Sequence, residues 1–179
     1  MSHHIDTEKF HEMVKDFIGY KLLQNNIFID DLTIEIPTTC SIAIDKVIAG
    51  YSDVFRSMCD NLRLTSYSVN SNFIRITNEL FQSGRNWGRV VIFLAFGATL
   101  AVYCAQRDDL RYKVKDIVAW VLRYMDQNLS CWIRENGGWN RFIYFVQPSD
   151  RRGFKMLRLF GLGFGLGVGV GALFMLSVG

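Results

Sequence analysis

One long apolar segment, residues 87–106, limits the folds that are open to this chain. Its core, residues 90–96 with the sequence VVIFLAF, is apolar on every face of a helix, as expected for a helix surrounded by other helices. Arg89 and Arg107 bound its apolar stretch, so the uncharged length falls short of a confident membrane span. We therefore predict a buried central helix here rather than a transmembrane one.

The other segments with helical periodicity are amphipathic. In residues 7–24 apolar side chains recur at steps of three and four, and Thr7 is expected to cap that helix. Further helices are expected over residues 40–60, 70–83 and 109–128, with a loop over 25–39. Asn136-Gly137-Gly138 is a stop signal, because glycine readily takes the left-handed conformation that ends helices. No convincing strand alternation precedes residue 160, so the sequence predicts an all-α bundle.

Composition excludes several classes of function. The chain has 179 residues, enough for one domain with a real core, and its net charge of +3 does not by itself argue for nucleic-acid binding. Its four cysteines are far apart in the sequence and no secretory signal is visible, which favours a reduced, cytosolic setting. The histidines, His3, His4 and His11, lie together at the N-terminus without metal-ligand spacing or a nucleophile–base pair. We expect no enzyme activity, no metal and no cofactor.

The end of the chain breaks the pattern of a soluble protein. Residues 160–178 carry no charge, and 19 residues of helix would be roughly 28 Å long, close to the thickness of a bilayer core. Basic residues immediately precede this run, as in a tail anchor with its basic side on the cytosolic face; they are Arg151, Arg152, Lys155 and Arg158. We therefore divide the chain into a bundle, residues 1–152, and a basic flank with a C-terminal transmembrane tail anchor, residues 153–179. A buried core helix is the alternative for the tail.

Four consecutive residues at the start of the apolar segment have the chemistry of a surface that binds a partner. Asn86 stands at the N-cap position, and Trp87 is most simply a core anchor. Gly88 leaves the first turn bare for another backbone to approach, and Arg89 offers a planar fork that matches a carboxylate. The alternative is that Arg89 is an ordinary surface residue, and residue chemistry alone leaves both interpretations open.

A second pattern favours helix binding. Within residues 44–55 four apolar residues have spacings of four, three and four, as in helices that lie in hydrophobic grooves. They are Ile44, Ile48, Tyr51 and Phe55. The small Ser52 adjoins Asp53 on the neighbouring face. The alternative is an ordinary core-facing helix with a solvated aspartate.

These segments resemble the four homology regions of the B-cell lymphoma-2 (Bcl) family of apoptosis regulators. NELFQSGRNWGRVVIFLAFG, residues 78–97, resembles the first region, and WIRENGGW, which opens residues 132–142, resembles the second. IDKVIAGYSDVF, residues 44–55, resembles the third, with Ser52 where glycine is usual, and MVKDFIGYKLLQ, residues 13–24, resembles the fourth. They occur in the family order, followed by the apolar tail. The stretch between Phe55 and Phe81 is shorter than is common in the family, which leaves the outer wall of the family's groove undefined.

The resemblance implies an all-α Bcl-like bundle around a central hydrophobic helical hairpin, with a groove that binds the amphipathic death helix of a pro-apoptotic relative. The partner's aspartate would pair with Arg89. The groove residues carried over are Arg89, Asn86, Gly88, Phe55, Glu79, Leu80, Val91 and Phe96, and the fold anchors are Trp87, Trp132, Gly137, Gly138 and Trp139. The chain's own death-helix motif would comprise Ile44, Ile48, Tyr51, Ser52, Asp53 and Phe55.

The fourth and second regions look closest to pro-survival members of the family. The expected function is therefore anti-apoptotic: capture of death helices that prevents permeabilisation of the mitochondrial outer membrane. The alternative is a pro-apoptotic pore-forming effector that exposes its own death helix and dimerises. We expect the tail to anchor the chain in the mitochondrial outer membrane facing the cytosol, with the endoplasmic reticulum membrane or the cytosol as alternatives. Homo- or heterodimers are conceivable, and no nucleic-acid partner is expected.

Overall fold

The computed structural model describes residues 2–30, 32 and 38–146, and within these residues all regular structure is helical. The α-helices are α1 (Ser2–Gln24), α2 (Thr39–Ile48), α3 (Ser52–Asn61), α4 (Val69–Gln82), α5 (Trp87–Ala105), α6 (Val114–Tyr124), α7 (Ser130–Glu135) and α8 (Gly138–Val146). The all-α prediction is confirmed. The tail anchor predicted for residues 153–179 lies outside the described residues.

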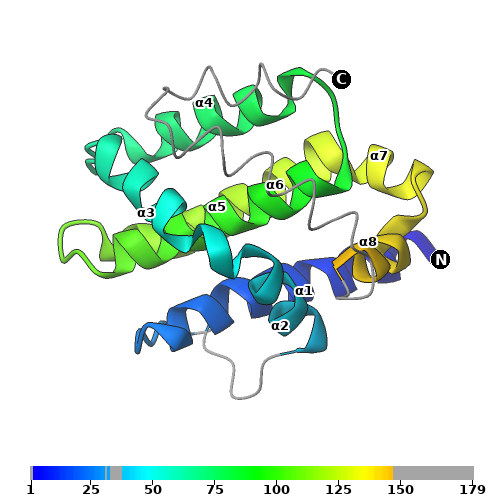
Figure 1. Ribbon diagram of the computed structural model, residues 1–179, viewed down its shortest axis with the longest axis horizontal. Coiled ribbons are helices and arrows are strands. Elements are labelled where there is room, and N and C mark those ends of the chain that lie inside the picture. The colour runs from blue at the N-terminus through cyan, green and yellow to red at the C-terminus, as the bar shows by residue number, and fades with distance from the viewer. Residues whose placement is uncertain (1, 31, 33–37, 147–179) are drawn as a thin grey trace.

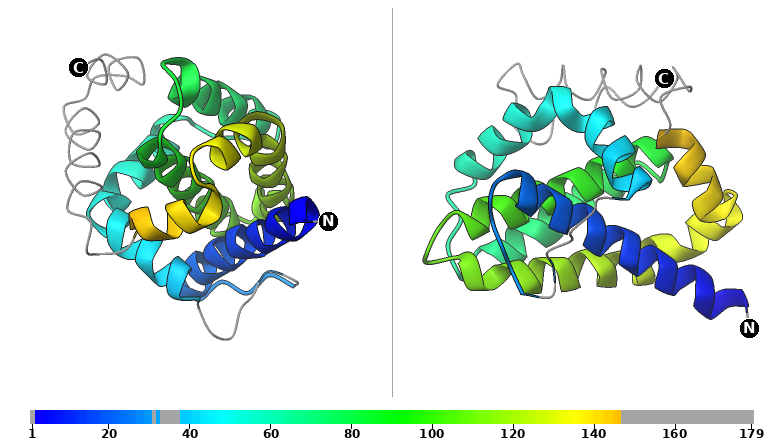
Figure 2. Two further views of the ribbon diagram at one scale, coloured as in Figure 1. Left: turned by 90° about the vertical axis from the view of Figure 1, so that its right-hand side faces the viewer. Right: turned by 90° about the horizontal axis from the view of Figure 1, so that it is seen from below.

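The apolar helix α5 is the centre of the bundle. It runs through the middle of Figure 1, and α1, α2, α3, α4 and α6 all contact it. The end-on view in Figure 2 shows the other helices wrapped around it. Among the described residues α5 is the one helix long and apolar enough to cross a membrane, but most of it is buried inside the protein. The predicted central core helix is therefore confirmed.

The N-terminal helix α1 is longer than its apolar periodicity indicates. It begins at Ser2, so Thr7 lies inside the helix and the predicted cap at Thr7 is wrong. Its apolar stripe, which includes Phe10, Val14 and Phe17, is buried. Four of the five residues 2–6 are polar, which is why the hydrophobic pattern alone did not reveal where the helix begins.

The single helix predicted over residues 40–60 is wrong, because two helices occupy this range. Thr38 caps α2 by accepting a hydrogen bond from the Ser41 backbone N–H at 3.1 Å. After Ile48 the chain tightens into a 3₁₀ turn, Ala49–Tyr51, before α3 begins. Gly50 lies in that turn, and glycine is among the weakest helix formers. A 3₁₀ stretch between helices is a usual place for a change in helix direction.

The connection from α3 to α4 is also brief. Residues 62–68 form turns, and Arg63 adopts a positive φ of 46° within them. The shortness that the sequence shows between Phe55 and Phe81 thus has a structural counterpart: within the described residues no further helix separates α3 from α4.

The helix predicted over residues 109–128 is regular only in its middle. A 3₁₀ turn, Arg111–Lys113, precedes α6, and a π-helical segment, Met125–Leu129, follows it. Side chains compete for backbone carbonyls in that segment: Ser130 Oγ donates to the Asp126 carbonyl at 2.6 Å, and Asn128 Nδ2 to the Tyr124 carbonyl at 3.3 Å. Side-chain bonds of this kind offer the backbone an alternative to regular helix.

Candidate partner-helix site

The start of α5 is held by a compact set of hydrogen bonds. Asn86 has an extended backbone, and its side-chain oxygen accepts the Arg89 backbone N–H at 2.9 Å, which confirms the predicted N-cap. Arg89 Nη1 donates to the Gly84 carbonyl at 2.6 Å. Gly84 has φ +107°, in the left-handed region that glycine adopts without strain. One arginine side chain therefore ties the first turn of α5 to the loop before it.

Arg89 is not the exposed cation that the sequence led us to expect. Only 2% of it is accessible, and burial lowers the pKa of its guanidinium. Arginine nevertheless stays protonated at neutral pH, because its ordinary pKa is so high. Arg89 is buried because its side chain bonds the Gly84 carbonyl and lies against the first turn of α5. A buried, positioned guanidinium is better suited to a directed carboxylate bond than a mobile surface one.

Trp87 fills the role of a core anchor at the same helix end. Its ring meets Trp132 of α7 edge-on, with centroids 4.8 Å apart, and Phe142 of α8 at 5.7 Å. Gly88, next along the helix, is buried, so the bare first turn is not open to solvent in this structure. The aromatic contacts fix the direction of α5 relative to α7 and α8.

The stop between α7 and α8 is built as the glycines predict. Gly137 and Gly138 have φ of +94° and +63°, a conformation that L side chains rarely adopt. The reversal brings Trp139 onto Phe10 of α1, where the two rings stack with centroids 3.3 Å apart. The second homology region thus closes the bundle against its first helix.

The remaining predicted groove residues lie on α5 and on two helices that contact it, α3 and α4. Phe55 lies on α3, Leu80 on α4, and Val91 and Phe96 on α5; both α3 and α4 contact α5. These side chains are buried, with Phe55 the most accessible at 7%. The structure therefore brings the three helices together and buries these side chains where the helices meet.

Glu79 is the charged member of this set. Its carboxylate pairs with Arg75 one turn back on α4, with Oε1 3.8 Å from Nη1. Its Oε2 is buried and finds no hydrogen-bond partner within the described part of the chain. A buried acceptor of this kind costs free energy as long as no donor reaches it.

The chain's own death-helix motif is not one continuous helix. Ile44 and Ile48 are buried on α2, Phe55 is buried on α3, and the half-buried Tyr51 ends the 3₁₀ turn between them. Ser52 and Asp53 are exposed. Equal apolar spacing on both sides of the turn made the segment look like a single amphipathic helix. The alternative interpretation, core-facing residues with a solvated aspartate, fits the observed state better.

Two features of the site had weak signals in the sequence. Gly84, whose carbonyl holds Arg89, stands out only as a glycine in the polar stretch before the cap. Phe73 of α4 packs against Phe93 and Phe96 of α5 and Trp120 of α6, with ring centroids about 6 Å apart. Its place in an apolar periodicity marks it as a core residue but does not show which helices it joins.

In the part of the chain that the structure describes, histidine, cysteine and carboxylate side chains form no group of three or more that could hold a metal ion.

The fold and the site define a class of protein: an all-helical bundle around an apolar central helix, with an arginine held at the capped first turn of that helix. The family model "Apoptosis regulator proteins, Bcl-2 family" matches residues 41–139. The chain belongs to this family, as its four sequence regions indicate.

Similar proteins fall within the same family. The chain is 36% identical over 107 residues to apoptosis regulator Bcl-2 of Cricetulus griseus, covering 60% of this chain and 45% of that protein. It is 39% identical over 99 residues to Bcl-2-like protein 1 of Gallus gallus, covering 55% of this chain and 43% of the relative. The matched region thus spans less than half the length of these curated relatives.

A solved structure supports the fold over more of the chain. It is described as the crystal structure of Trichoplax adhaerens trBcl-2L2 bound to trBak BH3. The likeness has a TM-score of 0.67 at 27% sequence identity, and it covers 79% of this chain and 99% of that one.

Proposed function

We propose that this protein is a pro-survival apoptosis regulator that captures the amphipathic third-region helix of a pro-apoptotic relative between α3, α4 and α5. Capture would keep that relative from permeabilising the mitochondrial outer membrane. The observation that carries the proposal is Arg89, a buried cation fixed by the Asn86 cap and the Gly84 carbonyl at the start of the apolar helix. The Trichoplax neighbour, solved with trBak BH3, supports a helix as the ligand.

In the proposed binding mode, one charged contact and several apolar contacts contribute to the affinity. The partner's aspartate pairs with Arg89, and a hydrogen bond to a charged group contributes about 1.5–3 kcal/mol. The partner's apolar side chains pack among Phe55, Leu80, Val91 and Phe96, each burial contributing about 1.5–3 kcal/mol. The apolar contacts therefore supply most of the affinity, and Arg89 sets the register of the bound helix.

Burial of these side chains has a consequence for binding. A partner helix reaches Arg89 and the buried apolar side chains of this set only if neighbouring groups move. Phe55, the most accessible of the set, lies on α3. We infer that binding is accompanied by displacement of α3 from α5, a change that lowers the observed affinity by the free energy of opening.

The pore-forming alternative requires the chain to present its own Ile44–Phe55 segment. In this structure Ile44 and Ile48 are in the core and the segment is interrupted by the 3₁₀ turn. Presentation would require α2 to leave α1 and α5, which it contacts. The effector role therefore requires a rearrangement of α2 that the proposed capture of a partner helix does not.

The uncharged tail supports membrane attachment. We propose that residues 153–179 anchor the chain in the mitochondrial outer membrane, with the bundle in the cytosol. The basic residues before the uncharged run favour this orientation.

Dye release from liposomes distinguishes the two roles. The full chain is incorporated into liposomes of mitochondrial composition, and release is measured with and without a pro-apoptotic pore-former and an activating third-region peptide. We expect the chain alone to cause no release with the peptide, and to reduce release by the pore-former in proportion to its amount. Release by the activated chain alone would instead establish the effector role.

A further inference from the structure

A polar cleft lies between the end of α1, the start of α3 and the last turns of α5, apart from the proposed partner-helix site. Its volume is ≈ 470 Å³, which falls within the range of roughly 300–1,000 Å³ that small-molecule sites occupy. Among the described residues that line it, Val102 and the ring of Tyr103 are apolar and the other side chains are polar or charged. Such a lining favours a ligand recognised by charge and hydrogen bonds over an apolar one.

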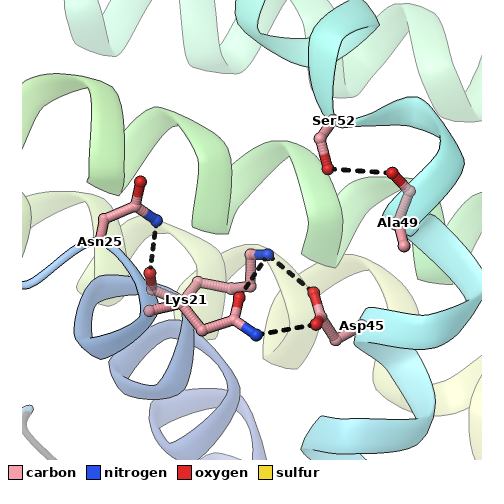
Figure 3. A network of polar contacts seen from close by, with 6 residues as sticks. Lys21, Asn25, Asp45, Ala49 and Ser52 are labelled. Atoms are coloured by element: carbon pink, nitrogen blue, oxygen red, sulfur yellow. Dashed lines mark hydrogen bonds and ion pairs between the residues drawn. The ribbon is translucent and has the colours of Figure 1, made fainter.

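The inner wall of the cleft already satisfies its own polar groups. Lys21 Nζ lies 2.7 Å from Asp45 Oδ1, and Gln24 Nε2 donates to Asp45 Oδ2 at 2.9 Å. Ser52 Oγ donates to the Ala49 carbonyl at 3.3 Å, and Figure 3 shows both sets of contacts side by side. The charges of Lys21 and Asp45 cancel. This wall therefore carries no net charge.

Two side chains of opposite charge on α3 line the cleft without pairing with each other. Asp53 and Arg56 are three positions apart, so their side chains share one face of the helix. Both are exposed, and no ion pair joins these two residues, although the structure describes both. Arg56 commits Nη2 to Gln106 Oε1 at 3.3 Å, and Asp53 has no hydrogen-bond or ion-pair partner within the described part of the chain.

These charges determine the chemistry of the ligand. A simple anion would be attracted by Arg56 and repelled by Asp53. A simple cation would be attracted by Asp53 and repelled by Arg56. Neither ion would therefore bind with much favourable free energy. A molecule with an ammonium group and an anionic group a few ångströms apart satisfies both charges at once. The hydroxyl groups of Thr99 and Tyr103 on α5 lie in the same lining and add hydrogen-bonding capacity.

We propose that this cleft binds a small dipolar ligand, with its ammonium group on Asp53 and its phosphate or carboxylate group on Arg56. The same chemistry has two sources, a free zwitterion in solution or the phosphoethanolamine headgroup of a membrane lipid. The site uses other residues than the partner-helix site but shares α3 and α5 with it, so displacement of α3 on partner binding would also change this cleft.

The test uses the full chain in detergent micelles, titrated with O-phosphoethanolamine, ethanolamine or inorganic phosphate and followed by amide chemical shifts. We expect O-phosphoethanolamine to bind at least about tenfold more tightly than either half-molecule, with shifts centred on residues 52–56 and 99–106. Asp53→Asn and Arg56→Gln should each weaken binding by about tenfold. Asp108→Asn and Arg123→Gln, exposed residues outside the cleft lining, are the matched controls and should leave it unchanged.

A second arm identifies the source of the ligand. The chain is reconstituted in nanodiscs containing phosphatidylethanolamine or only phosphatidylcholine, whose trimethylammonium group cannot donate a hydrogen bond. Cleft shifts that appear only with phosphatidylethanolamine and vanish in Arg56→Gln indicate a lipid headgroup; saturation by the free compound alone indicates a soluble zwitterion. The proposal is overturned if phosphate or ethanolamine binds as tightly as O-phosphoethanolamine, or if the two cleft variants behave like their controls.

Discussion

At the scale of single residues, the interior of the bundle leaves little room at Gly97. A Cβ added there would lie 2.7 Å from Val121 Cγ2 of α6. Both Gly97 and Val121 are buried. Gly97 is the last residue of the first homology region, so the requirement for a small residue there comes from the packing of α5 on α6.

Gly97→Ala is therefore expected to destabilise the protein despite the better helix propensity of alanine. Overpacking costs about 1–3 kcal/mol, whereas the gain in propensity is at most about 1 kcal/mol. Urea unfolding measures the difference. In the Val121→Ala background the clash is absent, so the same substitution should raise the free energy of unfolding. Equal effects in both backgrounds would show that Val121 does not set the limit.

The cysteines differ in accessibility, and this makes a second prediction. Burial raises the pKa of Cys59 and Cys104 to about 12 and that of Cys40 to about 11, whereas Cys131 is exposed. Since the thiolate is the reactive form, a raised pKa means slow reaction at neutral pH. We expect Cys131 to react rapidly with a thiol reagent in the native protein and the other three only after denaturation. Cys131→Ser should remove the rapid phase, and a rapid phase that survives would contradict the burial.

At the scale of elements, α1 holds α2 through the Lys21–Asp45 pair. The two side chains are only 17% and 18% exposed, and the bond joins two consecutive helices across the loop between them. Met13 and Cys40 add a second contact between the same helices, with the Cys40 thiol 3.2 Å from the Met13 sulfur. Because α2 carries the first half of the third homology region, these contacts keep that segment inside the bundle.

A double-mutant cycle on Lys21→Met and Asp45→Asn should give a coupling energy of about 1–2 kcal/mol, because shielding from water strengthens a charged hydrogen bond. The exposed pair Arg107–Asp109 serves as the control, with side chains 43% and 63% exposed. Its coupling should be much smaller, because water and salt screen charges on exposed side chains. Equal coupling in the two pairs, measured by urea unfolding, would mean that partial burial adds nothing to the α1–α2 contact.

The elements also show what a sequence can and cannot reveal. The bounds of α5 follow from the sequence because its cap, Asn86, and its uninterrupted apolar run are local signals. The break between α2 and α3 does not, since apolar spacing continues across Ala49–Tyr51. The inward position of Arg89 depends on where the Gly84 carbonyl lies. The loop that connects α4 to α5 determines that position. The Lys21–Asp45 bond is equally a product of the tertiary fold.

At the scale of the whole molecule, the described bundle and the uncharged C-terminal run have separate tasks in the proposed function. Removal of residues 153–179 is expected to shift the protein from the membrane fraction to the soluble fraction after alkaline carbonate extraction. The apolar surface of about 19 residues should otherwise make attachment resistant to this treatment. A control that replaces only Lys155 and Arg158 with glutamine keeps the uncharged run and should remain membrane-bound. Full-length chain found in the soluble fraction would contradict the anchor.

Helix capture is the central claim, and calorimetry of the full chain in detergent with third-region peptides tests it most directly. The wild type is compared with Arg89→Ala and with Arg123→Ala, a matched loss of charge at an exposed position of α6. We expect a third-region peptide to bind the wild type and the Arg123 variant equally, and the Arg89 variant about 10–100-fold more weakly. Thermal unfolding of the three proteins separates loss of the contact from loss of the fold. Equal binding by a folded Arg89 variant, or no binding of any peptide by the wild type, would contradict helix capture at this site.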